Sequence, residues 1–313
     1  MKYVGLQTQI WKNNSRSMLL LLMFPVVFYV LAWLFIFFTR DAEFRDPAVV
    51  TGEFVRVVPW VTLGVGVWFI IAWFSHSAMI NAATGSRPLS RKEDKRVYNL
   101  VENLSIAAGM KMPKVNVIED DSLNAFASGL NEKSYTISLS RGIIDKLNDD
   151  ELEGVIAHEL THIRNRDVRL LIVSIIFVGI FAFIAESLLR SMRFGSLGRG
   201  SKKGNGGGGI ILALALAAVG YLIASLFRFA ISRNREYMAD AGAATLTKKP
   251  LALASALKRV SGDPVIEAVR RKDVAQMFIE NPQVREKEAG FSLTSLFATH
   301  PPIKKRIQIL EQY

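Results

Sequence analysis

The chain has 313 residues, half of them apolar, a net charge of +11 and no cysteine. The absence of cysteine excludes disulfides, cysteine-ligated metals and a thiol nucleophile. So large an apolar fraction is rare in a soluble protein of this length and indicates membrane segments, beside which Lys and Arg commonly face anionic headgroups. We therefore assign the positive charge to a membrane surface and predict no nucleic-acid partner.

Four segments are apolar enough to enter a bilayer, which takes about 20 residues for a full crossing. They cover residues 18–39, 57–80, 170–185 and 210–229. The first is longer than the apolar part of a signal peptide and no cleavage site follows it, so we interpret it as a retained anchor. We expect two hairpins, 1–85 and 170–230, that embed a multi-pass protein in the lipid bilayer.

The distribution of basic residues predicts the orientation, because short loops rich in Lys and Arg stay on the cytoplasmic side. Such residues precede the first segment and follow the second, for example Lys12, Arg16, Arg87 and Arg91. Residues 86–169 should therefore face the cytoplasm. The loop 190–209 is also basic and rich in glycine, so the second hairpin either crosses against the rule or only dips into the membrane. In both cases residues 231–313 return to the side of 86–169.

The region between the hairpins has the pattern of a small α+β catalytic domain. Helical periodicity covers 92–109, strand-like alternation covers 114–119 and 134–140, and a short extended piece covers 124–129. Asn148 can cap a further helix whose first turn is acidic. We expect that helix to continue through Asp167 into the third apolar segment. After the fourth segment, 236–246 and 251–260 are typical of helices.

The helix that Asn148 is expected to cap carries the sequence HELTH at 158–162. His158 and His162 are four residues apart, so a helix places both imidazoles on one face, where they can bind one Zn²⁺. Glu159 can act as general base on the attacking water and pass the proton to the leaving amine. The competing interpretation is an amphipathic helix with two solvated histidines, but two of only four histidines in the chain lie here.

A catalytic zinc usually takes a third protein ligand, and no further histidine follows closely. Glu236 is the best candidate, because it comes just after the second hairpin and so lies on the side of the HELTH helix. Asp240, one helical turn later, can accept the free ring N–H of a metal-bound histidine. The competing interpretation is that Glu236 and Asp240 form ordinary ion pairs with Arg233 or Arg235.

Four motifs in a fixed order resemble those of a known family. They are NAFASG at 124–129, HELTH at 158–162, EYMAD at 236–240 and THPP at 299–302. The set is similar to the HtpX-type integral-membrane zinc metalloproteases, which are related to the CAAX prenyl proteases and to stress proteases of the mitochondrial inner membrane. HELTH alone occurs in many metalloproteases, whereas the ordered set is far more specific and covers most of the chain.

The resemblance implies a role for each matching residue and one Zn²⁺ per chain. His158, His162 and Glu236 match the metal ligands, Glu159 the catalytic base, Asp240 the carboxylate that supports a ligand, His300 a histidine that stabilises the oxyanion, and Asn124, Ala125, Phe126 and Ala127 a stretch beside the cleft. A substrate strand could pair there by β-addition. The implied fold is an α-helical membrane protein with about four transmembrane or membrane-inserted helices and a small α+β zincin-like catalytic domain.

The resemblance also implies a location and a function. We expect a protein of the bacterial inner membrane whose site faces the cytoplasm and cleaves misfolded or damaged membrane proteins in quality control and stress response. Other membrane proteases or chaperones are candidate partners. Two alternatives stay open. A non-catalytic membrane adaptor could keep the fold but would be free to lose Glu159, and a CAAX-type prenyl-protein peptidase would enclose a chamber with more spans than four.

Overall fold

The computed structural model describes residues 6–40, 45–193, 206–229, 234–262, 278–279 and 301–313. The chain forms two compact units whose segments alternate along the sequence. We call one the sheet unit, made of Met1–Arg16, Ser75–Ile172 and Phe229–Tyr313, and the other the apolar helical unit, made of Ser17–Phe74 and Val173–Arg228. Each unit is described separately below.

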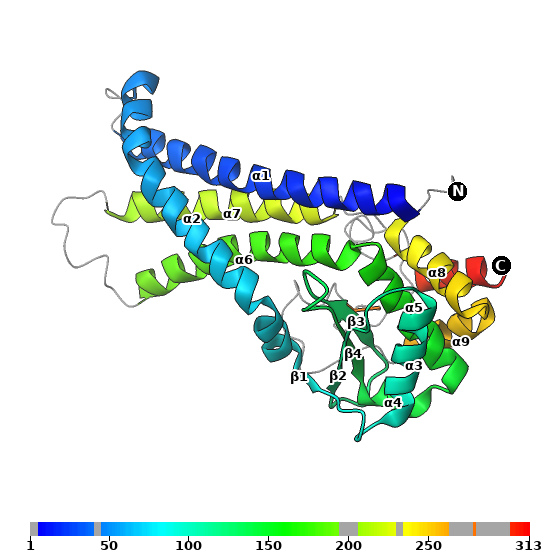
Figure 1. The fold of residues 1–313 in the computed structure, drawn as a ribbon. Coiled ribbons are helices and arrows are strands. Elements are labelled where there is room, and N and C mark those ends of the chain that lie inside the picture. Colours follow the sequence, from blue (N-terminus) through cyan, green and yellow to red (C-terminus); the bar gives the residue numbers. More distant parts are fainter. Residues whose placement is uncertain (1–5, 41–44, 194–205, 230–233, 263–277, 280–300) are drawn as a thin grey trace. The chain divides into compact units, whose positions relative to one another are not determined.

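The apolar helical unit is built from the long helices that are visible in Figure 1. They are α1 (Leu6–Thr39), α2 (Pro47–Thr84), α6 (Asp167–Arg193) and α7 (Gly206–Phe229), of which the first residues of α1 and α6 and the last of α2 belong to the sheet unit. Aromatic packing joins α1 to α6, where the rings of Phe24 and Phe177 lie 3.9 Å apart and those of Phe28 and Phe181 lie 4.7 Å apart. Helix α7 comes so close to α6 that a β-carbon on Gly220 would meet the Phe181 ring at 2.3 Å. The two helices of the predicted second hairpin are therefore packed against each other.

Within the described residues, three helices are long and apolar enough to cross a membrane: Trp11–Thr39, Pro47–Thr84 and Asp167–Arg190. They match the first three predicted segments, and the second is a longer helix than the predicted 57–80. The described apolar stretch of α7, Gly209–Ala224, is shorter. Whether α7 crosses the membrane therefore stays a prediction.

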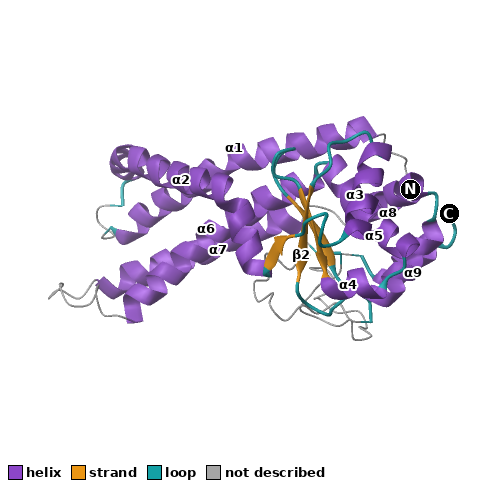
Figure 2. Ribbon diagram, turned by 60° about the horizontal axis from the view of Figure 1, so that its bottom comes forward, coloured by secondary structure: helices purple, strands orange, loops and turns teal. Residues whose placement is uncertain are grey.

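The sheet unit contains a four-stranded sheet, shown in orange in Figure 2. Its strands are β1 (Ser86–Pro88), β2 (Lys114–Ile118), β3 (Ala125–Ser128) and β4 (Thr136–Ser140), in the order β1-β2-β4-β3. Strand β2 runs parallel to β4, whereas β1 and β3 are antiparallel edge strands. Three of these strands, β2, β4 and β3, correspond to the predicted strands at 114–119 and 134–140 and to the extended piece at 124–129. Strand β1 was not predicted, because three residues are too few to show an alternating pattern.

The described residues of the sheet unit form six helices, one of which is the motif helix. They are α3 (Lys95–Ala107), α4 (Arg141–Lys146), α5 (Asp149–Arg164), α8 (Asn234–Thr247), α9 (Pro250–Val260) and α12 (Ile303–Leu310). Helix α5 carries HELTH and packs mainly on α8 and α9. A reciprocal capping box fixes its start, because the Asn148 side chain accepts from Glu151 N at 2.9 Å and the Glu151 carboxylate accepts from Asn148 N at 3.1 Å.

The motif helix does not continue into the third apolar segment, contrary to the sequence-based expectation. Helix α5 ends at Arg164 with Asn165 as its C-cap, and α6 begins at Asp167. Between them Arg166 has a φ of 60°, in the left-handed region, where a residue other than glycine costs about 1–3 kcal/mol. The break redirects the chain and turns the side chain of Asp167 back toward α5.

Candidate metal centre

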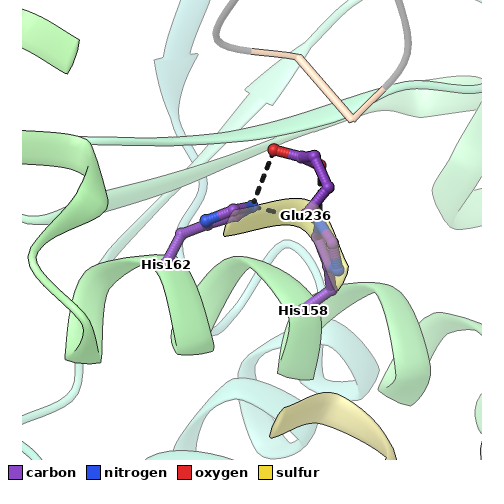
Figure 3. Close-up of side chains that lie close together, drawn as sticks. All are labelled: His158, His162 and Glu236. Carbon is purple, nitrogen blue, oxygen red and sulfur yellow. Dashed lines mark hydrogen bonds and ion pairs between the residues drawn. The ribbon is translucent and has the colours of Figure 1, made fainter. Parts of the chain in front are cut away.

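Helices α5 and α8 bring three predicted ligands together (Figure 3). The Nε2 atoms of His158 and His162 are 3.2 Å apart. Each also lies 3.6 Å from a carboxylate oxygen of Glu236, His158 from Oε2 and His162 from Oε1. All three possible ligand atoms lie within 4.8 Å of one another. Two segments that are more than 70 residues apart in the sequence thus converge on one point.

The spacing of these atoms fits a zinc ion. Tetrahedral Zn²⁺ binds imidazole nitrogen at about 2.0–2.1 Å, which places two such nitrogens about 3.4 Å apart. Two imidazole nitrogens that face each other at 3.2 Å can share only one proton between them, and they lie beside a carboxylate, with His158 fully buried and His162 13% exposed. A bound cation satisfies this donor set better than hydrogen bonds alone. The described residues therefore form a possible metal site with two nitrogen ligands and one carboxylate.

A close approach of the two helices sets the position of Glu236. A β-carbon on Gly242 of α8 would lie 2.4 Å from Cγ2 of Thr161 on α5, so only glycine allows this spacing. Glu236 and Asp240 precede Gly242 on the same helix by six and two residues, and they are 4% and 2% exposed. The glycine therefore controls how deeply the carboxylates of α8 reach toward the two histidines.

His158 is supported by Asp240, whose Oδ1 lies 3.0 Å from His158 Nδ1. The Asp240 carboxylate in turn accepts two hydrogen bonds from Arg306 of α12, at 2.9 and 2.7 Å. Burial opposes ionisation of this carboxyl, but the Arg306 guanidinium and the His158 ring outweigh it and lower the pKa of Asp240 to about 2. Asp240 therefore stays ionised and holds His158 with Nε2 toward the site.

His162 is supported by Asp167, whose Oδ2 lies 3.0 Å from His162 Nδ1. Burial opposes a proton on this ring, but the carboxylates of Glu236 and Asp167 outweigh it and raise the pKa of His162 to about 10. Burial also opposes protonation of His158, and its hydrogen bonds to Asp240 and Glu236 raise its pKa. Without a metal, the neighbouring carboxylates therefore favour a protonated His162, and a metal would displace that proton.

Glu159 points into the same small space. It is 2% exposed and lines a cavity of about 30 Å³ together with His162, Glu236 and Ala127. Burial raises the pKa of Glu159, and the two neighbouring histidines partly oppose the rise. The cavity has room for an ion and a water molecule, each water needing about 10–15 Å³. A base thus lies where an attacking water would be held.

The predicted substrate stretch lies on β3, at the edge of the sheet. Asn124, Ala125, Phe126 and Ala127 are all buried, and Ala127 lines the cavity. Part of this edge is already paired within the chain, because Phe126 forms an antiparallel bridge with Phe278 and Ile279 N donates to the Ala125 carbonyl at 2.8 Å. The backbone of β3 at this point therefore has the geometry that binds an added strand.

One predicted residue and three unexpected ones complete the description. His300 lies outside the described residues. Arg306, Asp167 and Asn13, which donates to Asp167 Oδ1 at 2.6 Å, were not singled out by sequence reasoning. A signal for Arg306 does exist, because Ile303, Ile307 and Leu310 form an apolar stripe on α12 and Arg306 falls on it. Asp167 and Asn13 have no comparable pattern.

An HExxH helix, a carboxylate from a later helix and a base at a shared cavity define a metal-dependent peptidase, and the apolar helices place it among the membrane-bound ones. The comparisons with known proteins agree. Residues 91–313 match the model of peptidase family M48. The chain therefore belongs to peptidase family M48 as an HtpX-type metalloprotease.

Two curated relatives support this assignment. A protease HtpX homolog of Bacteroides fragilis (strain YCH46) is 59% identical over the whole of both chains. Another, of Dictyoglomus thermophilum, is 41% identical over 83% of this chain and 82% of its own. The crystal structure of S. mikatae Ste24p aligns with a TM-score of 0.43 and 20% sequence identity. The alignment covers 96% of this chain and 66% of that one. So weak a likeness carries no argument about function.

Proposed function

We propose that this protein is a zinc-dependent endopeptidase of the bacterial inner membrane, which cleaves misfolded or damaged membrane proteins on the cytoplasmic side. The observation that carries the proposal is the convergence of His158, His162 and Glu236 beside the buried base Glu159. The three apolar helices support the membrane location. The basic residues that flank the first two support a cytoplasmic site.

The proposed chemistry assigns separate tasks to the residues of this site. Zinc, when bound, supplies a Lewis acid that activates water and polarises the substrate carbonyl. Glu159 accepts the proton of the attacking water and later passes it to the leaving amine. Its raised pKa suits this exchange, because a base works best when its pKa is close to the working pH. His300 would stabilise the negative oxygen of the tetrahedral species.

Substrate binding by strand addition suits β3, because this edge already accepts an antiparallel partner within the chain at Ala125 and Phe126. We place the substrate strand along the edge that Phe278 and Ile279 now occupy, next to Ala127 and the cavity. Backbone hydrogen bonds at such an edge accept almost any sequence, so selection would depend on whether a segment is extended and accessible. Unfolded segments and loops of membrane proteins meet this condition, which supports a role in quality control.

Neither alternative from the sequence has a comparable observation in its favour. A non-catalytic adaptor would have no use for a buried carboxylate at the cavity, and Glu159 is held there. A CAAX-type prenyl-protein peptidase would enclose a chamber with more spans than four, whereas the described residues contain three helices that are long and apolar enough to cross a membrane. An extended endopeptidase substrate would pair with β3 in place of Phe278 and Ile279.

Glu159→Gln tests the proposal, because it keeps the size of the side chain and removes its basicity. We expect zinc content to stay at one per chain, cleavage of an unfolded membrane-protein substrate to be lost, and uncleaved substrates to co-purify for identification by mass spectrometry. Glu153→Gln on the same helix is the matched control, since its carboxylate forms a surface ion pair with Lys249. Normal turnover by Glu159→Gln would refute the role of the base.

A further inference from the structure

The break between α5 and α6 places a second carboxylate against the candidate ligands. Because Arg166 adopts the left-handed conformation, the first residue of α6 points back at the helix that has just ended. Asp167 is 1% exposed, and its Oδ2 lies 3.0 Å from Nδ1 of His162. His162 therefore has the same kind of partner that Asp240 provides for His158.

The other oxygen of Asp167 is held by a residue from the far end of the chain. Asn13, near the start of α1, is fully buried, and its amide nitrogen donates to Asp167 Oδ1 at 2.6 Å and to the Asn165 carbonyl at 2.9 Å. A carboxamide nitrogen has two protons, and these two bonds use both. One side chain thus joins the residues on either side of Arg166.

The two histidines are consequently supported in parallel ways. On the α8 side the order is Arg306, Asp240, His158, and on the α6 side it is Asn13, Asp167, His162. In each case a buried donor fixes a carboxylate, and the carboxylate fixes the ring tautomer that presents Nε2 to the site. A purely structural role for Asn13, as an anchor of α1, would not require Asp167 to use its remaining oxygen on the His162 ring.

We infer that Asn13 and Asp167 are positioning residues for metal retention, with Asn13 acting on His162 only through Asp167. This inference rests on the proposed function, in which His162 is a zinc ligand. It makes the polar start of α1, more than 140 residues before HELTH, part of the metal centre. Substitutions of residues that hold a ligand histidine typically cost about 10–100-fold in metal affinity.

The test is the rate at which the purified full-length protein in detergent loses zinc to a chelator. We expect Asn13→Ala and Asp167→Asn each to raise this rate about 10–100-fold and to change the visible spectrum of the cobalt-substituted protein. Because Asn13 acts through Asp167, the double variant should lose zinc at nearly the rate of Asp167→Asn alone. Asn14→Ala, the neighbouring amide, is the matched control and should match the wild type.

Further variants separate the inference from its foundation. If Asn13→Ala does not fold, Asn13→Ser replaces it, since a hydroxyl can keep one of the two bonds, and an intermediate rate is expected. A wild-type rate for the Asn13 variants, or effects that multiply in the double variant, would overturn the inference. His162→Ala is measured alongside, and unchanged zinc content in that variant would refute the proposed ligand set itself, whatever the Asn13 variants do.

Discussion

Arg306 provides a quantitative test of how the centre is held, because it is a charge with no access to solvent. Its side chain is fully buried and makes two hydrogen bonds to Asp240, at 2.9 and 2.7 Å. Arg306→Leu fills much of the same space and leaves the Asp240 carboxylate buried without its cation. Breaking such a pair from one side costs about 3–5 kcal/mol, because the remaining charge is uncompensated.

The loss can be converted into a measurable shift. For a unit of about 200 residues, one kcal/mol corresponds to about 2–4 °C in the unfolding midpoint, so Arg306→Leu should lower it by roughly 6–20 °C. The assay is thermal unfolding of the metal-free protein in one detergent at one scan rate. Arg306→Lys keeps the charge but not the two-bond geometry, and it should show a smaller fall.

A double variant separates the ion pair from simple packing. Arg306→Leu combined with Asp240→Leu removes both charges, and replacing a buried pair by apolar residues is often close to neutral. We therefore expect the double variant to be more stable than Arg306→Leu alone. If its midpoint is instead lower by the sum of the two single effects, Arg306 and Asp240 do not form a coupled pair and the assigned support of His158 is incorrect.

Four shorter predictions concern the rest of the molecule. Gly242→Ala should push α8 away from α5 and lower the zinc content. Adding Thr161→Ala removes the clashing methyl group and should restore the zinc content, which metal analysis of both variants measures. Although burial opposes the shift, the neighbouring carboxylates raise the pKa of His162 to about 10. The metal-free protein should therefore lose stability between about pH 6.5 and 10, as this histidine gives up its proton. Zinc affinity, measured by chelator competition, should rise over the same pH range. A zinc affinity that falls, or a stability that rises, over this range would refute the assignment of a proton to His162. Ile279→Pro deletes the N–H that pairs with β3, so the edge becomes easier for a substrate strand to occupy. KM for an unfolded substrate should therefore fall more than in Ile279→Ala, and equal KM values in the two variants would argue against substrate pairing at this edge. Asn205→Cys should react only with a reagent outside the cell if the second hairpin crosses, and reaction from the cytoplasm alone would show that it does not.

Much of the site could be predicted from the sequence because its geometry is local. The spacing of His158 and His162 needs only one helix turn, and Asn148 marks the start of that helix. Placing Glu236 required only that the hairpin returns to its own side. The structure brings Glu236 and Asp240 to the two histidines rather than leaving them to surface arginines, although Asp240 does pair with the buried Arg306.

What the sequence could not reveal depends on backbone conformation and on contacts between distant segments. The helix break at Arg166 was missed because an arginine in the left-handed region has no sequence signal, unlike a glycine. The sequence pattern consequently predicts a continuous helix through Asp167. Asn13 lies in a polar stretch before the first span, and nothing local indicates that its amide reaches the α5–α6 turn.

X-ray absorption at the zinc edge of the purified wild-type protein, measured beside Glu236→Ala, shows whether these three residues hold the metal. We expect one zinc per chain, with two imidazole nitrogens and a carboxylate oxygen at about 2.0–2.2 Å. We also expect that Glu236→Ala loses the carboxylate signal and most of the metal. Full zinc content with an unchanged spectrum in Glu236→Ala, or a zinc without imidazole ligands in the wild type, would contradict this ligand set.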